Sequence, residues 1–398
     1  MIWKRGRSAA DRAGRDGGMR MPKQDPRRPR PSADLSCALC ALGATLALAF
    51  PAVAGQGPFQ GPFKTFPPMQ DLSGGVRWVD THAHLDGKLG ESVDFEGVAE
   101  TALAAMDRMG IKKTLVMPAP QPPAHRNLYE CDLFLAALRR FSGRFAFLCG
   151  GGSLNPMIQE VGDLSDVSER ARAKFAEKAE ALLAQGAVGF GEMTAMHLSH
   201  FSGHPFEAAA PDHPLFLLLA DIAARHEVVI DMHMDAVVSD IPLPARFSSP
   251  PNPPTLRANV GALERLLAQN RKAKIVWEHA GSDFAGQWTV ALSRALLAKH
   301  PNLYMSIRIN PPGVPENSPF TEGREIKPEW LELLRAFPDR FVLGSDTFYG
   351  SPRITLPVRR PPPAMMLMPL RMLLARMPPD IARSVGSENA ARIYRLKE

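Results

Sequence analysis

The chain has 398 residues, of which 45% are hydrophobic, 22% charged and 7% aromatic. This composition excludes a disordered or fibrous protein, because it supplies enough apolar side chain to bury a large core. The net charge of +6 does not indicate a nucleic-acid partner, because residues 1–34 hold ten Lys/Arg and four Asp/Glu, and the other 364 residues hold 37 of each sign. The length allows two or three average domains or one large α/β barrel.

The N-terminal region has the order of an export signal. Arginines within 27–30 precede an uncharged apolar run at 35–50, and an Ala-Val-Ala sequence at 52–54 follows as a cleavage site. The run is shorter than the ~20 residues that cross a bilayer. We therefore predict an exported protein, periplasmic or secreted, that loses residues 1–54 and keeps no stable membrane anchor; a buried core helix and an uncleaved anchor are the alternatives. Residues 55–75 are expected to form an irregular lead-in.

The four cysteines fall into two pairs. Cys37 and Cys40 lie in the apolar run and would be removed with it, which leaves Cys131 and Cys149 in the mature chain. Two cysteines do not make a disulfide framework, even in an oxidising compartment. We therefore expect both to be small buried hydrophobic side chains.

From about residue 76, short apolar runs alternate with longer amphipathic stretches. The strand candidates are 76–80, 113–117, 144–149, 187–191, 228–232, 274–277, 303–307 and 341–344. The helical candidates are 97–109, 127–140, 166–185, 213–225, 255–270, 287–299 and 328–336. Strict alternation predicts a parallel sheet, and eight units predict an α/β fold, a (β/α)8 TIM-like barrel over residues 76–398. An open doubly wound sheet is the alternative, disfavoured because no Gly-rich phosphate loop follows the first strand.

Three connections are long and rich in Pro, Ser and Gly. They follow the fourth, fifth and seventh strand candidates, at 194–211, 239–254 and 309–326. In a barrel of this kind, these loops lie on the face where active sites are built.

Histidines and carboxylates stand at the carboxyl ends of the predicted strands. His82 and His84 form an HxH at the end of the first strand, and alternate residues of a strand point the same way. The fourth, fifth, sixth and eighth strands end in Glu192, His233, His279 and Asp346. Each residue alone has an ordinary structural explanation, such as a core histidine or a turn carboxylate. Ionisable groups at five apolar strand ends are costly unless they are paired or metal-bound, so together they predict a divalent-metal site.

This pattern resembles the amidohydrolase superfamily of metal-dependent barrels. The segments WVDTHAHLDG, WEHAG, FVLGSDTF and NAARIY are similar to its amidohydrolase-related (amidohydrolase 2) branch, and the resemblance covers roughly residues 76–396. It implies a TIM-like barrel and a catalytic divalent metal. It does not fix the substrate, because the superfamily includes hydrolases, decarboxylases and isomerases.

The resemblance leaves the number of metal ions open. Many members with two metals carry a carbamylated lysine on the fourth strand, whereas this chain has Glu192. A glutamate there resembles the deoxyribonuclease-like members, in which it bridges two metals, and this slightly favours two ions. Other members hold one metal with the HxH, the fifth-strand histidine and the eighth-strand aspartate. Mixed imidazole and carboxylate ligands suit Zn²⁺, with Mn²⁺ or Fe²⁺ as alternatives.

The expected chemistry follows from these ligands. A divalent metal lowers the pKa of a bound water from ~15.7 toward ~7. Asp346 is expected to accept the proton and deliver it to the leaving group, while His279 holds a second metal or polarises the substrate carbonyl. The sequence thus predicts a metal-dependent hydrolase acting on an amide, ester, lactone or related bond of a small molecule; it is compatible with a homo-oligomer. The alternative is a non-oxidative decarboxylase of the same branch, which typically uses one metal and no fourth-strand glutamate.

Other residues carry weaker signals. Arg308 follows the seventh strand and either binds a substrate carboxylate or phosphate or forms a surface ion pair. Asp80, Asp86 and Asp231 could orient ligand histidines, or be solvated or capping carboxylates. Three histidines cluster after the fourth strand: His197, His200 and His204. They could form a second metal site, face the substrate from a polar loop, or lie on an exposed loop.

Overall fold

The computed structural model describes most of the chain after residue 75. The described residues are 76–124, 129–161, 167–200, 204–247, 251–309, 317–355 and 360–397. All of them belong to one unit, Ala54–Glu398. The predicted export signal at 1–54 and the lead-in at 55–75 lie outside the described residues.

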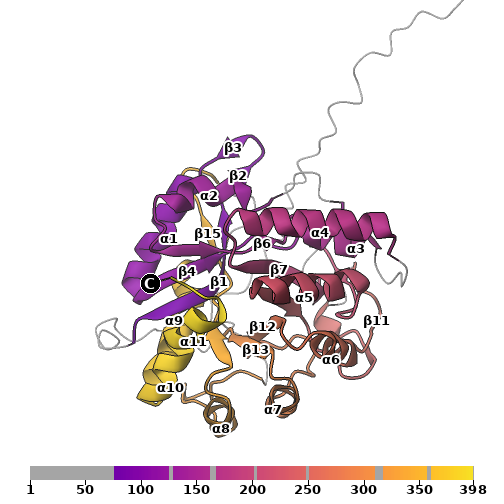
Figure 1. The fold of residues 1–398 in the computed structure, drawn as a ribbon. Helices are drawn as coiled ribbons and strands as arrows, with labels where there is room; N and C mark the ends of the chain where they lie inside the picture. The colour runs from indigo at the N-terminus through magenta and orange to yellow at the C-terminus, as the bar shows by residue number, and fades with distance from the viewer. Residues whose placement is uncertain are drawn as a thin grey trace, which may run out of the picture. The chain divides into compact units, whose positions relative to one another are not determined.

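Parallel strands build the main sheet, and the sheet closes on itself. In chain order they are β1 (Trp78–Asp86), β4 (Ile111–Val116), β5 (Phe145–Phe147), β6 (Cys149–Gly150), β7 (Gly189–His197), β9 (Val229–Met234), β12 (Lys274–Ala280), β13 (Leu303–Ile307) and β14 (Phe341–Leu343). Hydrogen-bonded neighbours follow the order β5-β4-β1-β14-β13-β12-β9-β7-β6. Only Leu148 separates β5 from β6, so both ends of this path are one stretch of chain. The eight-stranded TIM-like barrel is therefore confirmed (Figure 1).

Apolar side chains fill the amino-terminal end of the barrel. Successive strands contribute one buried cluster, which includes Val79, Leu115, Leu148, Val229, Val276 and Val342. Branched aliphatic side chains at the same level on different strands form the layers that fill such barrels. Ile393 and Tyr394 from the C-terminal helical segment belong to the same cluster. This end of the barrel is therefore a packed core, and the opposite end is left for polar groups.

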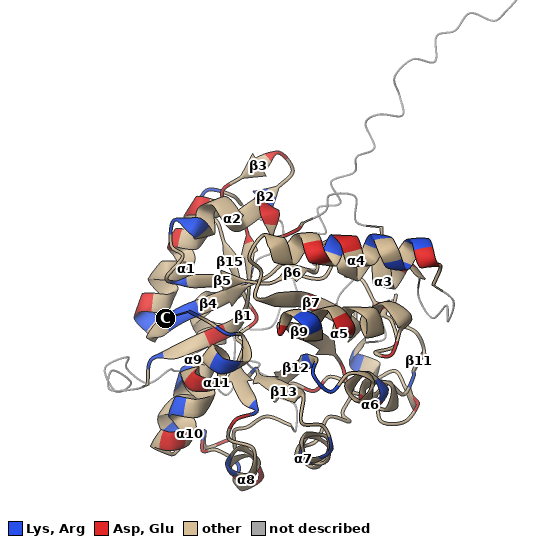
Figure 2. Ribbon diagram, viewed as in Figure 1, with Lys and Arg blue, Asp and Glu red and all other residues tan. Residues whose placement is uncertain are grey.

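Helices follow the strands and cover the barrel (Figure 1). Their bounds are α1 (Phe95–Met109), α2 (Asp132–Arg139), α3 (Leu154–Val161), α4 (Glu169–Ala184), α5 (Pro214–His226), α6 (Val260–Gln269), α7 (Val290–Lys299), α8 (Pro328–Ala336), α9 (Pro363–Arg376), α10 (Pro379–Arg383), η3 (Ser384–Glu388) and α11 (Asn389–Ile393). Lys, Arg and Glu are interspersed along α4 (Figure 2). Among the described residues, no helix has the length and apolar character needed to span a bilayer.

Local sequence sets the limits of these helices. The side chain of Asp94 accepts a hydrogen bond from the Gly97 amide and so caps α1. Gly110 ends the same helix at φ 69°, a left-handed conformation that glycine adopts without strain. Between these ends, Val98, Ala102 and other residues at helical spacing are fully buried against the barrel.

Short elements extend the loops at the carboxyl ends of the strands. They are β2 (Lys88–Leu89), β3 (Ser92–Val93), β8 (Glu207–Ala208), β10 (Ile241–Pro242), η2 (Ala245–Phe247), β11 (Thr255–Leu256) and β15 (Thr347–Gly350). Long connections follow the fourth, fifth and seventh strands, as the sequence predicts, although 201–203, 248–250 and 310–316 within them lie outside the described residues.

Four strands run further than the sequence predicts, β9 and β12 by two or three residues and β1 and β7 by six. The first candidate ended at residue 80, but β1 continues to Asp86, and β7 continues to His197. For β1 and β7 the reason is added pairing, because β15 lies parallel to β1 and β8 lies antiparallel to β7. The HxH and Glu192 are therefore within strands rather than just after them.

The expectation that Cys131 and Cys149 are separate buried side chains is wrong. The two form a disulfide with a Cα–Cα distance of 5.3 Å. Cys131 directly precedes α2, and Cys149 begins β6. The residue before α2 therefore lies beside the third strand of the barrel. This contact between two separate segments forms the bridge, and the number of cysteines alone did not predict it.

Candidate metal centre

Six side chains converge at the carboxyl end of the barrel. They come from five different strand ends, and they are the residues that the sequence predicts: His82, His84, Glu192, His233, His279 and Asp346. All are buried except Asp346, whose side chain is 12% exposed.

The first group of donor atoms surrounds the HxH. His84 Nε2 lies 3.2 Å from Asp346 Oδ1 and 3.4 Å from Glu192 Oε2. His82 Nε2 lies 3.6 Å from Glu192 Oε2 and 3.9 Å from Asp346 Oδ1. Donor atoms around a tetrahedral zinc are about 3.3 Å apart, given its usual bond lengths. These four atoms therefore have the spacing of a single metal site.

The second group shares Glu192 with the first. Glu192 Oε1 lies 2.8 Å from His233 Nδ1 and 3.7 Å from His279 Nε2. The two imidazole nitrogens are 3.0 Å apart. One oxygen of Glu192 thus faces each group, which is the arrangement of a carboxylate that bridges two cations.

Unpaired nitrogens show that the residues fit a cation. The Nε2 atoms of His82 and His84 are buried and have no hydrogen-bond partner among the described residues. Buried polar atoms are normally satisfied, so such atoms need an explanation. A divalent cation would be a partner for both, and the donors that converge on them are those that Zn²⁺ prefers.

Two buried carboxylates hold the other side of His82. Its Nδ1 lies 3.2 Å from Asp231 Oδ1 on β9 and 3.4 Å from Glu278 Oε2 on β12. A carboxylate at Nδ1 fixes the proton there and leaves Nε2 free to bind a metal. Asp231 therefore orients a histidine of another strand rather than His233. Glu278 was not predicted; the available signal was an acidic residue within the apolar strand that ends in His279.

These carboxylates also set the charge around His82. Burial, and then the nearby Asp231, raise the pKa of Glu278 well above its usual value, so this residue tends to stay protonated. Burial would lower the pKa of His82, but attraction by the ionised carboxylates, Asp231 first and then Glu192, raises it well above the usual value. The surroundings of this imidazole thus stabilise positive charge, and a metal cation would gain from the same field.

A backbone carbonyl holds His84 in the same way. Its Nδ1 is 3.0 Å from the Met117 carbonyl oxygen, which accepts the hydrogen bond, and Nε2 is left facing the carboxylates. Burial would lower the pKa of His84, but the nearby carboxylates of Asp346 and Glu192 raise it to about 9. In contrast, burial lowers the pKa of His279 to about 3, so this imidazole is neutral and suited to donate its lone pair.

An unusual backbone conformation aims Asp346. It has φ 53°, in the left-handed region, and its amide donates to the His82 carbonyl oxygen at 2.9 Å. The preceding Ser345 donates from its amide and its hydroxyl to Asp80, at 2.9 and 2.6 Å. A Cβ at Gly344 would lie 2.8 Å from the Cβ of His82, so only glycine fits there. Asp80 thus positions the loop that carries Asp346 rather than a histidine ring.

Arg308 contacts Asp346 directly. Its Nη2 lies 2.9 Å from Asp346 Oδ2, on the side away from the histidines. Burial would raise the pKa of Asp346, but Arg308 and then His84 hold it well below the usual range. Arg308 therefore keeps this carboxylate ionised. The third aspartate, Asp86, forms an ion pair with Arg360 at 2.7 Å, and no hydrogen bond or ion pair joins it to a histidine of either donor group among the described residues.

Three further histidines stand beside the second donor group. The ring centroid of His197 lies 4.6 Å from that of His233 and 4.8 Å from that of His204. Burial lowers the pKa of His200 and of His204 to about 4, so both are neutral near neutral pH. They form a neutral polar side of the centre, next to Phe284, whose ring lies 4.8 Å from His200.

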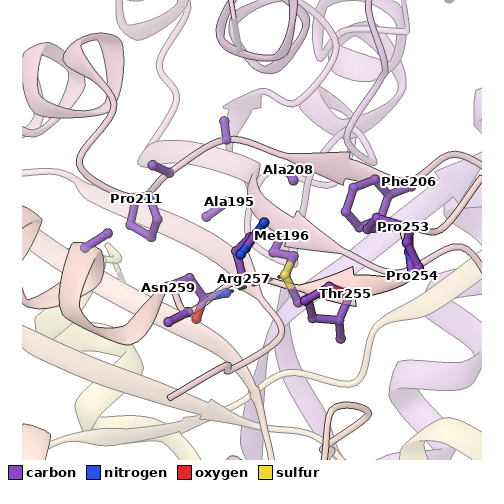
Figure 3. A pocket seen from close by; sticks show the side chains of 15 residues that line it. Ala195, Met196, Phe206, Ala208, Pro211, Pro253, Pro254, Thr255, Arg257 and Asn259 are labelled. Carbon is purple, nitrogen blue, oxygen red and sulfur yellow. Dashed lines mark hydrogen bonds between the residues drawn. The ribbon is translucent and has the colours of Figure 1, made fainter. Parts of the chain in front are cut away.

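A mainly apolar pocket lies away from the metal centre. It has a volume of about 510 Å³ and is bordered mainly by apolar side chains, including Met196, Phe206 and Pro211 (Figure 3). Its one charged lining residue, Arg257, is paired with Asp240 at 2.5 Å. None of the six converging residues lines this pocket, so its volume does not mark the site of chemistry.

Comparison with known families agrees with this site. The profile of the amidohydrolase family, described as Amidohydrolase, matches residues 159–396. The chain belongs to the amidohydrolase family. The matched segment contains Glu192, His233, His279 and Asp346, whereas the HxH lies before it and joins the site through the fold. As a family member, the protein is an enzyme of the hydrolase type.

Solved structures similar to this amidohydrolase are distant in sequence. Amidohydrolase 2 from Bifidobacterium longum subsp. infantis is 12% identical, with a TM-score of 0.32, over 80% of this chain and 99% of that one. IDCase from Metarhizium anisopliae, in its apo form, is 14% identical, with a TM-score of 0.47, over 82% and 99%. Dihydroorotase from Campylobacter jejuni is 15% identical, with a TM-score of 0.40, over 81% and 84%. Comparison with curated proteins gives no match.

The two donor groups predict how metal content responds to substitution. The double variant His82→Ala/His84→Ala removes two donors from the first group and none from the second. We expect the purified protein to bind two divalent ions and the variant to bind at most one, measured by elemental analysis after equilibration with zinc. His226→Ala, which alters an exposed histidine on α5, is the control and should keep both ions. Unchanged stoichiometry in the double variant would contradict the assignment.

Proposed function

We propose that this amidohydrolase is a metal-dependent hydrolase that uses activated water to cleave an amide, ester, lactone or related bond of a small molecule. The observation that carries the proposal is Glu192, which presents one oxygen to each of two donor groups beside Asp346. The family assignment supports a metal-dependent hydrolase or decarboxylase in general. The second donor group favours the hydrolase, because a decarboxylase of this branch typically needs only one metal.

The donor set defines what each residue contributes. His82, His84 and Asp346 would hold one ion, His233 and His279 a second, and Glu192 both. A divalent ion there, with zinc the best fit and manganese or iron as alternatives, lowers the pKa of water and polarises a substrate carbonyl. His279 would be committed to the second ion, and Asp346, although it would also hold the first, is the residue proposed to move a proton.

Asp346 is placed to act as the proton acceptor. Its Oδ1 faces the first donor group, while its Oδ2 is held by Arg308 at 2.9 Å. An ionised carboxylate accepts a proton from the attacking water and then returns it to the leaving group. Arg308 and His84 hold the pKa of Asp346 below its usual range, so the carboxylate is ionised and has no proton of its own.

Removing the ionisable group of Asp346 tests this role. Asp346→Asn keeps the shape and one ligand oxygen but accepts no proton. We expect the variant to fold and retain most of its metal, while kcat falls by roughly 10²–10⁴ on a substrate found by screening amides, esters and lactones. Asp339→Asn, which alters a carboxylate that is 64% exposed, should leave kcat unchanged. A normal kcat for Asp346→Asn would refute the role, and loss of metal would leave Asp346 as a ligand only.

A variant of Arg308 distinguishes a role in positioning Asp346 from a role in binding the substrate. Arg308→Met removes the charge that lowers the pKa of Asp346, so that pKa should rise. Because activity needs the ionised carboxylate, the acid limb of the kcat–pH profile should move to higher pH, and the variant should lose activity at low pH where the wild type keeps it. A substrate-binding arginine would instead raise KM and leave this limb in place. Arg335→Met, on the exposed face of α8, serves as the control.

We infer that the enzyme acts outside the cytoplasm, periplasmic or secreted. The order of features in residues 1–54 supports this, and so does the Cys131–Cys149 disulfide, because such bonds persist in oxidising compartments. Protein recovered from the periplasm or medium should begin at Gly55 and titrate no free thiol until it is reduced, when two should appear. An N-terminus at an early methionine would contradict cleavage, and free thiols in the unreduced protein would contradict the disulfide.

A further inference from the structure

A small cavity opens directly beside the metal centre. Its volume is about 300 Å³, at the lower end of the range for ligand pockets. We call it the His84 pocket. Five side chains that line it are used below: His84, Asp86, Lys88, Phe348 and Arg360. Because His84 belongs to the first donor group, a molecule bound in this pocket lies next to the reacting atoms.

One wall of the His84 pocket is a stack of three flat groups. The Phe348 ring lies 4.3 Å from the His84 ring, centroid to centroid. The guanidinium carbon of Arg360 lies 4.1 Å from the Phe348 ring centroid. Arg360 Nε also donates to Asp86 Oδ2 at 2.7 Å. Two contacts thus hold the guanidinium in place, while its two Nη groups have no hydrogen bond among the described residues.

A second cation lines the same cavity. Lys88 lies on β2 in the short hairpin with β3, and no carboxylate lies within 4.0 Å of its ammonium group among the described residues. Asp86 offsets only one of the two positive charges in the lining. The His84 pocket therefore carries a net positive charge next to the first donor group.

Among the described residues, Arg308 is the other cation that contacts the donor groups, and it offers no comparable anion site. Arg308 is committed to Asp346, and its side chain is only 16% exposed. The neighbouring His200 and His204 are neutral. An anionic part of a substrate is therefore attracted toward the His84 pocket rather than toward Arg308.

We propose that the His84 pocket binds a carboxylate at the non-reacting end of the substrate. This deepens the proposed function and rests on it. The free edge of Arg360 presents paired N–H donors in the plane that matches a carboxylate, and Lys88 adds a compact charge. Phe348 covers the body of the substrate between the carboxylate and the scissile bond. The substrate class is thus a small amide, ester or lactone that carries a carboxylate away from the bond that is cleaved.

Binding of simple acids to the zinc-loaded enzyme tests the proposal. Linear dicarboxylates from malonate to adipate are compared, by titration calorimetry, with monocarboxylates of the same carbon number. One carboxylate can bind at the metal centre in both series, but only the dicarboxylates can also reach the pocket. We expect at least one dicarboxylate to bind about tenfold more tightly than its monocarboxylate partner, as one charge-assisted contact would give.

Variants of the two cations show whether the preference arises in this pocket. Lys88→Met/Arg360→Met should remove the preference and leave monocarboxylate affinity within about twofold of the wild type. Lys88→Met alone keeps the Asp86–Arg360 pair and should lose part of the preference, which guards against misfolding of the double variant. Lys272→Met/Arg335→Met, at exposed positions distant from the pocket, is the matched control and should keep it.

The outcomes separate this proposal from the proposed function. Equal affinity for both series in the wild type, or an unchanged preference in the double variant, would overturn the pocket assignment. Selectivity for dicarboxylates in a protein that hydrolyses no amide, ester or lactone would uphold the pocket and remove the proposed function. Metal-dependent hydrolysis without selectivity for dicarboxylates would uphold the proposed function and overturn the pocket assignment.

Discussion

A single buried carboxylate organises the functional end of this barrel. Glu192 lies within 3.7 Å of nitrogens from four histidines, which come from three different strands. Burial alone would raise its pKa, but His82, His233 and His279 lower it well below the usual value, so it stays charged. Uncompensated buried charge is costly, and here it is offset only because the closed barrel brings those strand ends together.

The surrounding residues determine how these imidazoles are used. Asp231 and Glu278 on one side, and the Met117 carbonyl on another, fix which nitrogen of His82 and of His84 faces the centre. Arg308 does the same for Asp346 by holding one of its oxygens. The barrel therefore contributes more than ligands, because each ligand is oriented by a partner from a neighbouring strand or loop.

One end of the barrel stabilises the fold, and the other end carries the functional residues. At the amino-terminal end, apolar side chains from successive strands and Ile393 and Tyr394 form a continuous core. At the carboxyl end, the extended β1 and β7 project polar side chains beyond that core and gain extra pairing from β15 and β8. This separation allows a costly cluster of buried ionisable groups at one end, because close packing at the other stabilises the same strands.

The sequence by itself determined the eight strands and the six residues that converge. Apolar runs mark strands, and parallel strands in a barrel bring their carboxyl ends to one face, so residues such as His82 and Asp346 could be predicted to meet. The tertiary structure alone decided the Cys131–Cys149 bond and the partners of His82 and Arg308. These contacts join residues 18 or more positions apart across strands or loops, and their pairing depends on how the barrel closes and where each loop runs, which local patterns do not encode.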